Sequence, residues 1–254
     1  MNVLALRDAS THTADPAAAL AGVLGISVTE ARGRLHGAGP RVLAIHADRD
    51  QAERARAALS ARGFAAFVLG MDEVQRDQAE TVAAVAFELH EASFEVQTSG
   101  SGGIGIPYEA VRLVVRGLRI VQSTRTDTSN ERVLSVGKAL VTGGLAFTKK
   151  VQATTTRTEE DRALFARLFS FGRPPVDLPA DELRYRGLGA AMQQTRAGNF
   201  AALLAELGRR AGHAAFDDQL ATRGGQLQVL SERLPPERFL EVAVSLVARA
   251  HGAR

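Results

Sequence analysis

Along the first 70 residues, short apolar runs alternate with segments in which apolar residues recur every three or four positions. This pattern predicts a small domain of alternating strands and helices. Runs of Val, Leu, Ile and Phe predict buried strands, and apolar residues spaced three or four apart predict amphipathic helices. The helix starts carry local signals, such as Asp15-Pro16 and the capping box that joins Ser27 to Glu30. The predicted order is strand 3–6, helix 17–24, helix 27–37, strand 41–46, helix 48–62 and strand 64–69.

The pattern changes after residues 71–80, a polar stretch that predicts a linker or a short helix. Short apolar runs then follow one another closely, which is typical of an antiparallel β domain. The predicted strands are 82–89, 94–97, 104–121, 132–141, 145–158, 164–171 and 183–185. Gly143-Gly144 suits a two-residue hairpin turn, and residues 195–210 predict an amphipathic helix that closes the domain.

The tail, residues 213–254, predicts two further helices, the second of which begins at Pro235-Pro236. Apolar residues of this last helix form one stripe: Phe239, Val242, Leu246 and Ala250. The opposite side has no basic cluster of the kind that binds a membrane surface. We therefore expect the stripe to pack on the β domain or on a second copy of the chain.

Residues 25–35, GISVTEARGRL, together with Gly37-Ala38 and the sequence QAERA from residue 51, resemble the C-terminal domain of the bacterial ribosomal stalk protein. That family has the same βααβαβ order and binds other proteins without catalysing a reaction. Its signature helix presents lysines to translation factors, whereas this segment has none. The resemblance implies a protein-binding module without a ribosomal role, with Arg32 and Arg34 as candidate contact residues. Solvated helix charges are the alternative interpretation of these two arginines.

The strand count, the closing helix and residues 106–114, IPYEAVRLV, resemble pleckstrin-homology-like domains and the related GRAM domains. In that family, the lysines that bind phosphoinositides lie in the loop between the first two strands. Here the corresponding loop, residues 90–93 (HEAS), has no Lys or Arg. The resemblance therefore implies a protein-binding member of the family more than a phosphoinositide-binding one.

These patterns together predict an α+β chain of four parts. They are a βααβαβ module over residues 1–70, a linker over 71–80, an antiparallel β-rich pleckstrin-homology-like domain with a C-terminal helix over 81–212, and a helical tail over 213–254.

Charge is segregated within the β-rich part. Residues 77–111 contain six Asp or Glu and no Lys or Arg, whereas residues 112–173 contain twelve Lys or Arg against five Asp or Glu. Strands of opposite sign can pair across a sheet, which would satisfy these charges internally. The other interpretation is a basic surface for an acidic protein partner. The formal net charge is only +3, and Arg far outnumbers Lys, which favours a protein partner over nucleic acid.

All three lysines lie in the predicted hairpin around Gly143-Gly144. This turn would place Lys138 opposite Lys149, next to Lys150, and like charges that face each other across a ladder repel. Lysines beside an apolar hairpin tip suit an anionic membrane surface or an acidic protein groove. A shifted register that separates the lysines is the alternative.

Candidate chemistry is sparse. Residues 100–105, GSGGIG, fit the glycine pattern of dinucleotide-binding loops, but the β-branched segment that follows is a poor helix, which favours a hairpin loop. His46, Asp48 and Asp50 lie together at a strand end, where Asp48 is explained as a helix cap and the sequence nominates no further metal ligand. The absence of cysteine excludes disulfides and thiolate chemistry.

The sequence therefore predicts a non-catalytic, cofactor-free adaptor that binds another protein. A peripheral membrane protein using the lysine hairpin and a nucleotide-binding enzyme using the glycine loop are the alternatives, and homo-oligomerisation is left open. The chain has no apolar run long enough to span a bilayer and begins without a signal peptide, so we expect a cytoplasmic protein.

Overall fold

The computed structural model describes residues 1–8, 13–36, 39–100, 102–134, 148–222 and 239–254. It shows a mixed α+β architecture with one three-stranded and one seven-stranded sheet. The chain divides into two compact units, the first formed by residues 1–119 and 163–254 and the second by residues 120–162. None of the helices in the described ranges is both long enough and apolar enough to cross a membrane.

The first 70 residues form the predicted order of elements. They are β1 (Asn2–Leu6), α1 (Pro16–Leu24), α2 (Val28–Leu35), β2 (Arg41–His46), α3 (Arg49–Ser60) and β3 (Ala66–Gly70). The caps predicted from the sequence are confirmed, since Asp15 accepts the N–H of Ala18 at 3.0 Å and Ser27 accepts that of Glu30 at 3.1 Å. Asp48 caps α3 in the same way.

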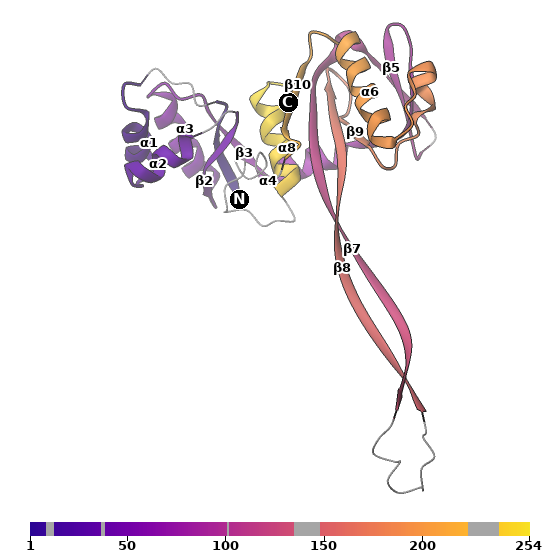
Figure 1. The fold of residues 1–254 in the computed structure, drawn as a ribbon. Helices are drawn as coiled ribbons and strands as arrows, with labels where there is room; N and C mark the ends of the chain where they lie inside the picture. Colours follow the sequence, from indigo (N-terminus) through magenta and orange to yellow (C-terminus); the bar gives the residue numbers. More distant parts are fainter. Residues whose placement is uncertain (9–12, 37–38, 101, 135–147, 223–238) are drawn as a thin grey trace, which may run out of the picture. The chain divides into compact units, whose positions relative to one another are not determined.

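The three-stranded sheet has the order β2-β1-β3 with antiparallel pairs. Figure 1 shows α1, α2 and α3 on one face of this sheet, where Leu4 and Leu6 pack with Leu20 and Leu59 in one core cluster. The opposite face is also buried. Its side chains, such as Val3 and Ala5, belong to a second cluster that includes residues from later elements of the chain.

The rest of the chain adds one helix and then the larger sheet. The elements are α4 (Met71–Glu80), β4 (Val82–Leu89), β5 (Ser93–Thr98), β6 (Gly103–Pro107), η1 (Tyr108–Ala110), β7 (Val111–Leu134), β8 (Thr148–Ser170), β9 (Val176–Pro179), η2 (Tyr185–Ala191), α6 (Arg196–Arg210), β10 (Ala215–Leu220) and α8 (Phe239–Ala250). The prediction of a helix over residues 195–210 is confirmed, and residues 71–80 are a helix, the second of the two predicted options.

The larger sheet has the order β10-β7-β8-β9-β4-β5-β6. The prediction of a purely antiparallel sheet is wrong, because β4 pairs with β9 and β10 pairs with β7 in parallel. The predicted helix at the start of the tail is also wrong, because the described part of that segment contains β10. This strand pairs with β7, which lies about a hundred residues earlier in the chain. This non-local pairing leaves no periodic signal in the segment itself.

Several strand predictions need smaller corrections. The predicted strand 104–121 is interrupted by the 3₁₀ turn η1, and β7 continues without the predicted break between residues 121 and 132. The described part of the predicted strand 145–158 and the predicted strand 164–171 belong to one strand, β8. Residues 183–185 form only an isolated bridge between Arg184 and Ala86. The predicted turn at Gly143-Gly144 lies outside the described residues.

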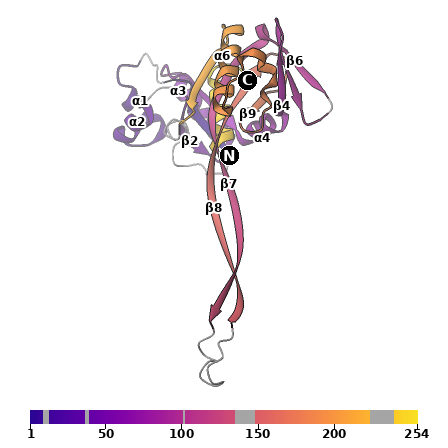
Figure 2. The ribbon, with the colours of Figure 1, turned by 45° about the vertical axis from the view of Figure 1, so that its right-hand side comes forward.

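In the second unit, β7 and β8 continue over residues 120–134 and 148–162. Both views show the two strands side by side and coiled around each other within this unit (Figure 2). An isolated two-stranded ribbon is only marginally stable in water.

Two core clusters stabilise the larger sheet. Helix α6 contributes Phe200, Leu203 and Leu207 to a cluster with β4, β5, β8 and β9. Helix α8 is buried in the cluster that also holds the second face of the small sheet. The predicted apolar stripe is confirmed at Val242, Leu246 and Ala250, which are all buried, and Val244 and Val247 extend it around the helix.

Candidate partner-binding groove

A groove of about 980 Å³ lies beside β4. It forms because β4 pairs with β9 only at Val82 and Ala83. Further along β4, the neighbour is the segment that follows β9, where the N–H of Arg184 donates to the carbonyl of Val85 at 2.9 Å. The groove therefore lies between the second half of β4 and the η2 segment.

The η2 backbone approaches β4 so closely that position 187 requires glycine. A Cβ built on Gly187 would lie 2.1 Å from the carbonyl oxygen of Phe87, and the obstacle is backbone that cannot rotate away. Glycine permits this approach because it has no side chain.

Replacement of Gly187 by alanine is expected to push η2 away from β4 and to lower the free energy of unfolding by about 1–3 kcal/mol. The control is Gly208→Ala in α6, whose added Cβ would make only ordinary contacts, 3.6 Å or more from the ring of Phe216. This control should stabilise the protein, because alanine is favoured over glycine within a helix. Urea unfolding measures both, and two effects of the same sign would contradict the packing described.

Aromatic rings pack beneath the groove, where Phe87 and Tyr185 line it but are only 2% and 6% exposed. Phe87 and Phe94 lie with ring centroids 5.8 Å apart, and Tyr185 meets Phe87 edge-on at 6.2 Å. The hydroxyl of Tyr185 donates to the carbonyl of Ala180 at 2.6 Å. Since the ring is buried, desolvation raises the pKa of Tyr185 to about 12.

This pKa predicts an alkaline loss of stability. An unfolded tyrosine loses its proton near pH 10, while folded Tyr185 keeps it up to about pH 12, so between these values the unfolded chain binds fewer protons. The contribution is therefore complete below pH 10 and is lost as the pH rises to about 12, by about 2–3 kcal/mol. Tyr185→Phe should reduce the stability difference between pH 9 and pH 11.5 in urea unfolding. An unchanged difference would show that Tyr185 ionises normally.

The rim of the groove carries three arginines on the η2 side. Arg184 and Arg186 are exposed, and no hydrogen bond or ion pair joins either guanidinium to another residue in the described part of the chain. Arg196 donates to the carbonyl of Asp181. Met192, 55% exposed, lies among the same lining residues. This side of the groove therefore offers unpaired positive charge next to an exposed, flexible apolar side chain.

Two carboxylates lie near His90 on the β4 side. His90 lies 3.8 Å from Glu88 and 3.2 Å from Glu95, measured from its Nε2 to the carboxylate oxygens. The carbonyl of His90 accepts bonds from Tyr108 and Arg210. The η2 side thus carries two exposed guanidinium groups without a described partner, beside the exposed carboxylate of Glu182, which also lines the groove.

The residues singled out from the sequence lie elsewhere. Arg34 is largely buried, pairs with Glu30 at 2.6 Å and donates to the carbonyl of Leu43, so it ties α2 to β2. Arg32 is exposed on α2. Lys149 and Lys150 belong to β8 in the second unit, where only the backbone is described, and Lys138 lies outside the described residues.

The other candidate sites from the sequence are explained by local structure. The glycine segment lies where β5 pairs with β6 in an antiparallel hairpin, with residues 103–105 inside β6, so the hairpin prediction is confirmed. The segment is followed by the short 3₁₀ turn η1 and not by the α-helix that a dinucleotide-binding loop requires. Asp48 is the cap of α3. Within the described ranges, no three His, Cys, Asp or Glu side chains gather closely enough to hold a metal ion.

The expected pairing between the acidic and the basic segments is not seen among the described side chains. Arg116 instead pairs with Asp218 of β10 at 3.1 Å, and Arg119 pairs with Asp177 of β9 at 3.0 Å. Sheet order explains the difference, because β8 and β9 separate β7 from the acidic strands β4 and β5.

A buried charge cluster, which the sequence did not reveal, connects β8, β9 and α8. Arg167, with only 4% of its side chain exposed, donates to both oxygens of Asp177 at 2.6 and 2.9 Å and to both oxygens of Glu241 at 2.6 and 3.2 Å. Burial alone would lower the pKa of Arg167, but the hydrogen bonds to the two carboxylates outweigh burial and raise it. Arg119 also pairs with Asp177, so two arginines neutralise the two carboxylates. The cluster is therefore a structural one.

Comparison with models of known protein families, with curated proteins and with solved structures finds no match for this chain. The function is therefore inferred from the groove and its charges.

Proposed function

We propose that this chain is a non-catalytic interaction protein that binds an acidic segment of a partner protein in the groove between β4 and η2. The observation that carries the proposal is the pair of exposed guanidinium groups at Arg184 and Arg186, which have no partner in the described part of the chain, beside the exposed side chain of Met192. A guanidinium presents a rigid fork of donors that matches a carboxylate in two parallel hydrogen bonds.

The apolar features of the groove support a polypeptide partner. Met adapts its shape to different apolar surfaces, and Met, Arg and aromatic residues are enriched where proteins meet. The volume of about 980 Å³ is at the upper end of the range for small-molecule pockets, about 300–1,000 Å³. An extended acidic segment with one apolar side chain would use both the arginines and Met192.

Affinity purification from the source cell, with two charge-reversal variants, tests this function. The groove variant Arg184→Glu/Arg186→Glu should lose the partner. Arg32→Glu, which changes an exposed arginine on the stalk-like module, should retain it. Loss of the partner with Arg32→Glu alone would instead assign binding to the stalk-like surface.

Membrane binding through the lysine hairpin is the second candidate, carried by the concentration of all three lysines in the hairpin segment. Co-sedimentation with anionic vesicles separates it from the first. A vesicle-bound fraction that Lys149→Glu/Lys150→Glu abolishes and Arg184→Glu/Arg186→Glu retains would favour the membrane. A pleckstrin-homology-like fold for residues 81–212 and a cytoplasmic location remain part of this proposal.

A further inference from the structure

The turn between β8 and β9 carries an exposed aromatic side chain, and hydrogen bonds hold the backbone at both ends of the turn. Phe171 is 78% exposed, more than any other large apolar residue in the described part of the chain. Its N–H donates to the carbonyl of Ala110 at 2.9 Å, and at the other end of the turn Pro175 accepts the N–H of Val82 at 2.9 Å. Gly172, at φ = +68°, supplies the left-handed residue that the turn needs.

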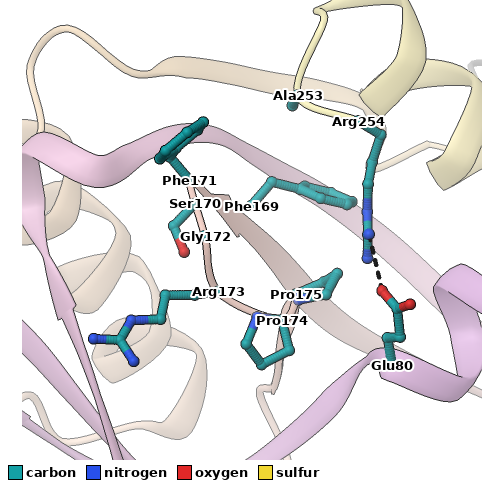
Figure 3. Close-up of a pocket in the computed structure, with 10 residues that line it drawn as sticks. All are labelled: Glu80, Phe169, Ser170, Phe171, Gly172, Arg173, Pro174, Pro175, Ala253 and Arg254. Atoms are coloured by element: carbon teal, nitrogen blue, oxygen red, sulfur yellow. Dashed lines mark hydrogen bonds and ion pairs between the residues drawn. The ribbon is translucent and has the colours of Figure 1, made fainter.

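A pocket of about 520 Å³ lies directly beside this turn. Phe169, Pro174, Pro175 and Ala253 give it apolar walls, and Phe171 itself lines one side, as Figure 3 shows. The ion pair between Arg254 and Glu80, at 3.0 Å, borders it on the side away from Arg173. A phenyl ring fits such a pocket in size and in chemistry.

Charges of both signs border the same pocket. Arg173 is exposed, and within the described ranges it has no hydrogen-bond or ion-pair partner. Glu80 is half-exposed although it meets Arg254, which also lies 3.5 Å from Asp77. One surface patch therefore contains the protruding ring of Phe171 beside an apolar pocket. The same patch carries Arg173, which has no described partner, and the half-exposed carboxylate of Glu80.

We infer that this patch binds a second copy of the chain across a two-fold axis, with Phe171 of each copy in the pocket of the other. A two-fold interface brings the same patch of both copies together, so it requires self-complementarity. This patch meets that requirement by combining a protruding phenyl ring with an apolar pocket, and an exposed arginine with a half-exposed glutamate. In the dimer, Arg173 of each copy faces Glu80 of the other. This inference goes beyond the proposed function, because it uses a different surface from the β4–η2 groove.

Sedimentation equilibrium of the full chain, from about 1 µM to about 1 mM, tests this interface, since a patch of this size gives a weak dimer. Wild-type protein should dimerise as the concentration rises, and Phe171→Ser should weaken association at least tenfold. The matched control is Phe216→Ser, which changes another exposed phenylalanine, on β10, and should leave association unchanged. Circular dichroism checks that each variant is folded.

A charge exchange tests the two-fold arrangement itself. Arg173→Glu alone and Glu80→Arg alone each place like charges face to face twice, so neither should dimerise. An equimolar mixture should form a heterodimer, because each contact then joins Glu to Arg. The inference is overturned if wild-type protein stays monomeric at the highest concentration, if Phe171→Ser associates as well as wild type, or if the mixture does not associate.

Discussion

Replacing Arg167 with methionine is expected to lower the free energy of unfolding by about 3–5 kcal/mol, the cost of breaking a buried ion pair from one side. The substitution keeps most of the side-chain volume and removes the donors that satisfy Asp177 and Glu241. Arg119 would still reach Asp177, but Glu241 would lose its one described cation, Arg167. Urea unfolding of the full chain measures the effect.

Arg209→Met is the matched control for this experiment. Arg209 also pairs with a carboxylate, Glu206 at 2.8 Å, but its side chain is 66% exposed. Exposed pairs contribute at most about 1 kcal/mol, so the control should unfold almost as wild type does. Equal losses for the two variants would show that Arg167 is not buried among its carboxylates.

Reversing the charges of Arg184 and Arg186 is expected to weaken binding of an acidic partner at least about a hundredfold. A hydrogen bond to a charged group contributes about 1.5–3 kcal/mol, and each 1.4 kcal/mol changes the dissociation constant tenfold. Stability should change by no more than about 0.5 kcal/mol, because both side chains are exposed and unpaired in the described structure.

Salt offers an independent check of the groove. Binding by exposed arginines should weaken as salt rises, because ions screen exposed charges beyond about 10 Å at 0.1 M. Arg32→Glu should retain full affinity and the same salt dependence as wild type. A partner that binds the doubly reversed variant as tightly as wild type would exclude these two arginines from the binding site.

Elements with local signals can be predicted from the sequence. Asp15, Ser27 and Asp48 each accept a backbone N–H within three residues of their own position. Each helix start can therefore be predicted from the few residues around the cap. The spacing of apolar residues predicts helix α6 for the same reason, since the signal lies within the segment itself.

Elements that depend on distant partners cannot be predicted in this way. In β10, the segment AFDDQL has two adjacent carboxylates, and it is a strand because it pairs with β7 and because Asp217 meets His251 at 3.0 Å. Arg167 has a weak signal, since it is a single arginine in the apolar run LFARLFS. Its partner Glu241, however, lies 74 residues further along the chain.

The groove can be anticipated only in part. The predicted strand over residues 183–185 includes Arg184, but Tyr185 begins the 3₁₀ segment η2, so strand alternation does not place Arg186. Nothing in the sequence shows that both arginines lack partners, because that depends on which carboxylates the fold brings near. The excess of positive charge over residues 112–173 points to the basic segment instead and misses these arginines, which lie just beyond it.

Selection of random-sequence peptides on the immobilised protein is the sharpest test of the groove, because it works with a partner of any identity. We expect the selected peptides to carry Asp or Glu next to an apolar residue. We also expect them to bind Arg184→Glu/Arg186→Glu at least about a hundredfold more weakly than wild type. Selected peptides without acidic residues, or acidic peptides that bind both proteins equally well, would contradict an acidic partner in this groove.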